Sequence, residues 1–111
     1  MSQPTYQQDM EQDYDLALNI CTRLGMRILP RYKWPAWTTD FETALSLLED
    51  DLAVLEVQLT SVPNAEEGRT YYVTVHTFLA LVTGIADTPA KAACKAWIEV
   101  DKLRRQGALP K

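Results

Sequence analysis

The chain has 111 residues, of which 47% are hydrophobic and 23% charged, and its net charge at pH 7 is −4. This length suits a single core, and so many large apolar residues exclude disorder over most of the chain. No apolar run approaches the ~20 residues of a membrane span, and we see no secretory signal. We therefore expect a cytoplasmic protein, and its acidity argues against direct nucleic-acid binding.

The first segment predicts a tail and a helix. Residues 1–8 are polar and predict a disordered tail, so a single α+β domain would span residues 9–107. A helix is expected from about Asp9 to Met26, with acids in its first half and Arg23 in its last turn, which complements the helix dipole. Its apolar residues recur at helical spacing and are Leu16, Ile20 and Leu24.

A loop and a second helix follow. Two prolines within residues 28–37 forbid a continuing helix and predict an ordered loop. Thr39 is followed three residues later by Glu42, which is the spacing of a capping box, so we expect Thr39 to cap the next helix. That helix should run over about residues 41–48, where apolar side chains recur at helical spacing.

The middle of the chain changes to a period of two. Residues 52–60 and 69–77 alternate apolar and polar side chains, which predicts an antiparallel hairpin with a loop of about eight residues. Residues 78–86 are more uniformly apolar and are either a third strand or a helix. On the first strand, the alternation places three apolar residues on the buried face: Leu55, Val57 and Leu59.

The last helix has clear start and stop signals. Thr88 is expected as its N-cap and Pro89 as its first residue, and Gly107 should end it. The chain thus has a run of helices, a run of strands and a final helix. This order predicts an α+β fold, with a small antiparallel sheet of two to three strands packed with three helices.

The order of these motifs resembles a known family. Pro35-Ala-Trp-Thr-Thr-Asp40 runs into a helix, a strand pair follows, and Ala86-Asp-Thr-Pro89 opens a helix containing Ala93-Cys-Lys-Ala96. Over about residues 12–100 the chain resembles the phage ABA-sandwich domain family, departing from it in a second Trp near the loop, a longer last helix and an acidic N-terminal segment. The resemblance implies an α-β-α sandwich-like fold and a phage or prophage accessory protein, and it implies no catalytic residue.

A dense group of basic and aromatic residues surrounds the Pro-containing loop. Its cations suit phosphates, its rings can stack on bases, and Trp and Arg are enriched in protein-interface hot spots. Alternatively, one or both tryptophans cover the core where the loop crosses it. We take the group as the candidate site for a partner or ligand: Arg27, Arg31, Tyr32, Lys33, Trp34 and Trp37.

A second candidate surface is acidic. Four acids at the start of the first helix have no base among them: Asp9, Glu11, Asp13 and Asp15. They could imitate a phosphate backbone or bind a basic host protein. Alternatively, they complement the helix dipole and add solubility.

Little in the chain suggests catalysis or metal binding. An enzyme could be drawn around His76, Glu56 and Tyr72, although the same residues fit one polar face of a hairpin. Whether that face is exposed is left open. Cys21 and Cys94 each lie on the apolar face of a predicted helix and are expected to be small core residues. We predict no metal site and no cofactor.

Three functions remain as hypotheses. The first and favoured one is non-enzymatic, stoichiometric binding of a host or defence-system protein, for counter-defence or host modulation. The second is sequestration of a small nucleotide-like signalling ligand, possibly between the subunits of a homodimer. The third is an enzyme built around His76.

Overall fold

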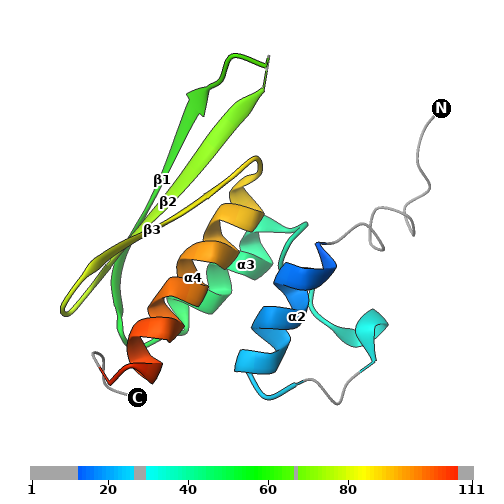
Figure 1. Ribbon diagram of the computed structural model, residues 1–111, viewed down its shortest axis with the longest axis vertical. Coiled ribbons are helices and arrows are strands. Elements are labelled where there is room, and N and C mark those ends of the chain that lie inside the picture. The colour runs from blue at the N-terminus through cyan, green and yellow to red at the C-terminus, as the bar shows by residue number, and fades with distance from the viewer. Residues whose placement is uncertain (1–12, 27–29, 67, 108–111) are drawn as a thin grey trace.

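The computed structural model describes residues 13–26, 30–66 and 68–107. Over these residues the expected α+β fold of three helices and a small antiparallel sheet is confirmed (Figure 1). The sheet has the order β1-β2-β3, so β1 and β3 are its edges. In chain order the elements are α2 (Tyr14–Arg23), the 3-10 turn η1 (Arg31–Lys33), α3 (Phe41–Glu49), β1 (Val54–Pro63), β2 (Arg69–Thr77), β3 (Leu81–Ala86) and α4 (Pro89–Arg105).

The described helices all lie to one side of the sheet (Figure 1). Helix α4 packs on β3 and β2, α3 lies beside α4, and α2 contacts α4 on the side away from the sheet. The layers are therefore sheet, then α3 with α4, then α2. The α-β-α sandwich that the family resemblance implied, with the sheet between helices, is not the layering of these residues.

Local signals set the helix ends, with three corrections. The helix expected from about Asp9 begins at Tyr14, because Asp13 has a non-helical backbone conformation and its carboxylate caps the helix. Helix α2 ends at Arg23 rather than near Met26, because Gly25 takes a left-handed φ of +76°, which stops the helix. Helix α3 is capped by Asp40 rather than Thr39, because the Asp40 carboxylate accepts a hydrogen bond from the Thr43 N–H. Residues 1–12, which include the predicted tail and the first residues of the predicted helix, lie outside the described residues.

The hairpins follow the prediction with a shorter first loop. Strand β2 has the expected bounds, and the loop before it spans only residues 64–68. Asn64 closes this loop, because its N–H donates to the Gly68 carbonyl and its Oδ1 accepts from the Glu66 and Gly68 N–H groups. Residues 81–86 form the third strand, which decides between the two alternatives for this segment.

The core surrounds α4, which packs against the sheet on one side and against α2 and α3 on the others, and it leaves most of β1 uncovered. Val73 and Val75 of β2 are fully buried. Val57 is half-buried, but Leu55 and Leu59, expected on the buried face, are 58% and 46% exposed. That expectation was wrong because α3 contacts β1 only slightly and covers little of it.

Helix α4 begins as predicted, and its small residues bring it close to the sheet. Thr88 accepts a hydrogen bond from the Lys91 N–H, and Pro89 is the first helical residue. Gly84 of β3 meets the helix so closely that an added Cβ would stand 2.1 Å from the Ala92 carbonyl oxygen. Only glycine allows this approach of strand and helix.

Candidate functional site

The turn η1 is the centre of the candidate site, and its backbone is held by prolines and turn hydrogen bonds. The Lys33 N–H donates to the Pro30 carbonyl, and the Trp34 N–H donates to the Arg31 carbonyl. Pro35 follows directly, so the chain leaves the turn in an extended direction. The side chains of the turn therefore start from a backbone with little conformational freedom.

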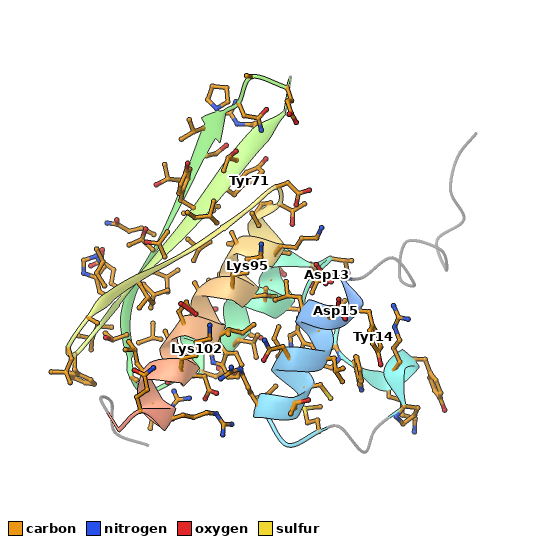
Figure 2. All side chains as sticks on the ribbon, in the orientation of Figure 1. Asp13, Tyr14, Asp15, Tyr71, Lys95 and Lys102 are labelled. Atoms are coloured by element: carbon orange, nitrogen blue, oxygen red, sulfur yellow. The ribbon has the colours of Figure 1, made fainter. Side chains whose placement is uncertain are left out.

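Aromatic contacts fix η1 against the start of α2. The Tyr14 and Trp34 rings are stacked, with centroids 5.9 Å apart and planes 22° from parallel. The Arg31 guanidinium lies over the Tyr14 ring, 4.7 Å from its centroid, which is within cation–π range. Figure 2 shows Tyr14 between α2 and η1, beside Asp13 and Asp15. Tyr14 was not among the predicted site residues, because nothing in the sequence around it indicates that η1 folds back onto it.

The structure divides the predicted basic and aromatic group. Tyr32 is 83% exposed, and Arg31 and Lys33 on either side of it are exposed too. Trp34 is half-buried beneath them. Trp37 belongs to the hydrophobic core, and its carbonyl accepts a hydrogen bond from the Cys94 thiol. Trp37 is therefore not exposed beside Tyr32, and the alternative of a core-covering tryptophan holds for it.

The remaining predicted site residues are Arg27 and the four acids. Arg27 lies outside the described residues. Of the acids, Asp9 and Glu11 also lie outside them, and Asp15 is exposed. Asp13 caps α2: its carboxylate accepts from the Leu16 N–H, and its own N–H donates to the Thr38 hydroxyl. The helix-terminal alternative therefore holds for Asp13, which fixes the start of α2 beside η1.

The polar face of the sheet is open. Glu56 and His76 are opposite each other in the register of β1 and β2, and both are exposed. Tyr72 is four residues from His76 along β2, about 13 Å at the usual rise of a strand. The three side chains therefore share one flat face without converging on one point. This arrangement gives no support to a catalytic site there.

A charged network that the sequence analysis missed joins α2 to α4. Asp101 is 4% exposed, and its carboxylate accepts hydrogen bonds from Arg23, Arg104 and Arg105 at 2.7–2.9 Å. Burial alone would raise the pKa of Asp101, but the hydrogen bonds from Arg105 and Arg23 outweigh it and hold the pKa below its usual value. The available signal was an acid on the apolar face of α4, followed by arginines three and four residues later.

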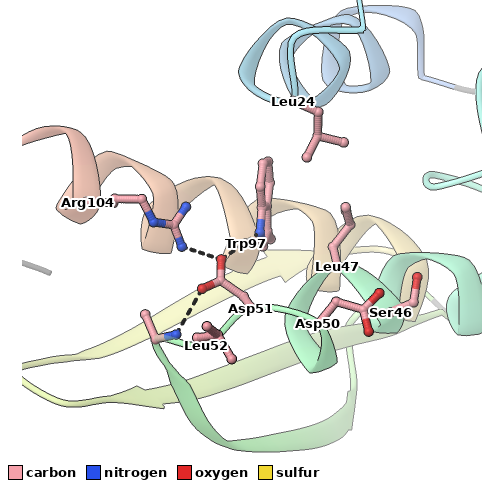
Figure 3. A pocket seen from close by; sticks show the side chains of 9 residues that line it. Leu24, Ser46, Leu47, Asp50, Asp51, Leu52, Trp97 and Arg104 are labelled. Atoms are coloured by element: carbon pink, nitrogen blue, oxygen red, sulfur yellow. Dashed lines mark hydrogen bonds and ion pairs between the residues drawn. The ribbon is translucent and has the colours of Figure 1, made fainter. Parts of the chain in front are cut away.

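The network continues into a cavity of about 360 Å³ between α2, α3 and α4 (Figure 3). There the Asp51 carboxylate accepts hydrogen bonds from the Arg104 guanidinium, the Trp97 indole N–H and the Ala53 N–H. Leu24 and Leu47 supply apolar walls. The main polar groups of this cavity thus already bind one another, which leaves little to recognise a nucleotide.

The two cysteines are core residues, as expected. Cys21 and Cys94 are both free and fully buried. Burial, with a smaller contribution from the charge of Asp13, raises the pKa of the Cys94 thiol to about 12, so it is a poor nucleophile. Within residues 13–26, 30–66 and 68–107, no three His, Cys, Asp or Glu side chains gather in a way that suits a metal ion.

No family model, no curated protein and no solved structure matches the chain. The resemblance to the phage ABA-sandwich family therefore stays a prediction. Among the helices in the described part of the chain, none has the length and apolar character needed to cross a membrane.

Proposed function

We propose that the protein acts without catalysis, by binding another protein stoichiometrically through η1. The observation that carries this proposal is Tyr32, an aromatic side chain left 83% exposed on a turn whose neighbours are fixed. From the family resemblance we infer the setting: the cytoplasm of a bacterial host that carries a phage or prophage. The partner would be a host or defence-system protein, bound for counter-defence or host modulation.

The construction of η1 supports a binding role. Arg31 and Trp34 both contact Tyr14, so the first residue of the turn and the residue that follows the turn are held before any partner arrives. A side chain that is already positioned loses little conformational entropy on binding, which favours affinity. Tyrosine also offers a large contact area with a hydroxyl at its tip, which is why it is enriched in interface hot spots.

The charges next to Tyr32 indicate the chemistry of the partner. Arg31 and Lys33, which precede and follow Tyr32 in the chain, are exposed cations. A partner surface that offers carboxylates around a pocket for one aromatic ring would match this turn. The acid that remains exposed at the start of α2, Asp15, would oppose a phosphate-bearing ligand. We therefore place the protein partner ahead of the nucleotide-like ligand.

The proposal is tested by quantitative affinity capture from a bacterial lysate with three forms of the chain. These are the wild type, Tyr32→Ala, and Phe78→Ala as the control. Phe78 is also an exposed aromatic, 58% accessible, in the turn between β2 and β3. We expect a partner that the wild type and the control retain and Tyr32→Ala loses. If each retained protein binds all three forms equally, the role of η1 is refuted.

The nucleotide-like ligand is examined in parallel. Thermal shift against linear and cyclic nucleotides measures binding to the folded chain directly, because a bound ligand stabilises it. We expect a flat response. Stabilisation by one nucleotide that is lost in Arg31→Ala would favour sequestration instead.

A further inference from the structure

We propose that the free edge of β1 pairs in antiparallel orientation with β1 of a second copy of this chain. The pairing would join two three-stranded sheets into one and bring the exposed Leu59 side chains of the two copies together. This surface is formed by β1 and α3, away from η1, so the inference does not rest on the proposed function.

Every second residue of β1 directs its backbone N–H and C=O groups away from β2. Along an antiparallel strand, successive residues direct their N–H and C=O groups to opposite sides. The Asn64 N–H donates to the Gly68 carbonyl across the first hairpin. The backbone N–H and C=O groups of the even-numbered residues of β1 therefore point toward β2. The groups of Val57, Leu59 and Ser61 therefore face the outer edge. No other strand of the described residues pairs there, and such an edge can template pairing with another chain.

Features at both ends of β1 limit the part of its outer edge that can pair with another strand. A register shift lies between Val54 and Glu56, and Pro63 has no N–H to donate to a strand on the outer edge. Bulges and prolines are devices that block edge pairing. Between them, the residues from Val57 to Ser61 form a regular segment with Leu59 at its centre.

The segment from Val57 to Ser61 can pair with a second copy of itself. A two-fold axis at Leu59 places Val57 of each copy opposite Ser61 of the other, which pairs the outward groups of all three residues. Glu56 is the one charged residue of β1. It lies three residues from the axis, so the Glu56 residues of the two chains would lie about 20 Å apart. This distance exceeds the ~8 Å screening length at physiological salt. A neutral strand without opposed like charges suits a second copy.

Pairing would also bury apolar surface beside β1. A groove of about 520 Å³ runs between β1 and α3, and Leu55 and Leu59 remain largely exposed along it. Phe41 and Leu45 line its other side. When two sheets join through a two-fold axis normal to them, both helix layers lie on the same side. The Leu59 side chains of the two copies would then lie next to each other on that side, and each would cover part of the other.

The first test is the mass of the full chain in solution over a wide range of concentrations. We expect twice the chain mass of 12.6 kDa, and loss of the dimer in Leu59→Lys, which would set two like charges opposite each other. The control is Leu81→Lys, which adds the same charge at an exposed position of β3 and should leave the dimer intact. A wild-type monomer throughout, or a dimer unaffected by Leu59→Lys, would overturn the proposal.

A second test works without disrupting the strand. Opposed residues of this kind have Cα atoms about 5.5 Å apart, within the range that a disulfide spans. Leu59→Cys should therefore form a covalent dimer on mild oxidation, while Thr83→Cys on β3 should not. The native cysteines are buried and supply no competing bridge. Equal cross-linking of both variants, or of neither, would contradict pairing at Leu59.

Discussion

Replacing Asp101 by alanine should remove the charge that holds α2 against α4. Arg23 belongs to α2, whereas Arg104 and Arg105 follow Asp101 on α4, and all three donate to its carboxylate. Helix α2 in turn carries Tyr14, on which Arg31 and Trp34 rest. The substitution therefore tests the element that supports the candidate site without altering the site itself.

The expected loss of unfolding free energy depends on how deeply the arginines that contact Asp101 are buried. The Arg23 and Arg104 side chains are less than one-fifth exposed, so each would lose a partner in a place with little solvent. Removing one member of a buried ion pair costs about 3–5 kcal/mol. Because both arginines keep some access to water, we expect about 3 kcal/mol, the low end of that range. For a domain of this size, the melting temperature should fall by roughly 12–24 °C.

The pH dependence gives an independent check. The pKa of Asp101 is lower in the folded protein than in the unfolded chain, where it is about 3.9. Its contribution to stability is therefore fully present above the unfolded value and is lost as pH falls through the folded value. We expect the wild type to lose stability on acidification more steeply than Asp101→Asn.

Urea unfolding followed by tryptophan fluorescence measures these differences. Arg105→Ala is the matched control, because the exposed Arg105 should contribute less than about 1 kcal/mol. A loss below 1 kcal/mol for Asp101→Ala, or equal losses for both variants, would refute the reasoning.

Two further predictions concern the core. Gly84→Ala should cost about 1–3 kcal/mol in urea unfolding, since its Cβ would meet the Ala92 carbonyl oxygen, whereas Gly68→Ala, which meets only the Asn64 side chain, should be nearly neutral. Neither buried cysteine should react with a thiol reagent until the chain unfolds. Rapid modification of one equivalent in the native protein would contradict that packing.

Local signals in the sequence were enough to predict most element types. Thr88 and Pro89 start α4 as expected, because a cap and a first-turn proline act within one turn of helix. The bounds of β2 follow from its alternation, since its apolar face is covered by α4. The α+β class follows from the order of these elements.

Burial depended on tertiary contacts that no local pattern encodes. Leu55 and Leu59 alternate as a buried face would, but α3 does not extend over them. Trp34 and Trp37 are alike in the sequence, and only the path of the loop places one beneath η1 and the other in the core. Tyr14 and Asp101 were missed for the same reason, since each gains its role from residues far along the chain.

The proposed function requires that the side chain of Tyr32 contacts a protein partner. Site-specific photo-crosslinking in bacterial cells tests it most directly, with the photoreactive amino acid at position 32 and, as the control, at position 78. We predict one discrete cross-linked protein from position 32 that is absent from position 78. Once purified, that partner should bind Tyr32→Ala roughly 30-fold more weakly than the wild type. No product at position 32, or the same products at both positions, would contradict the claim.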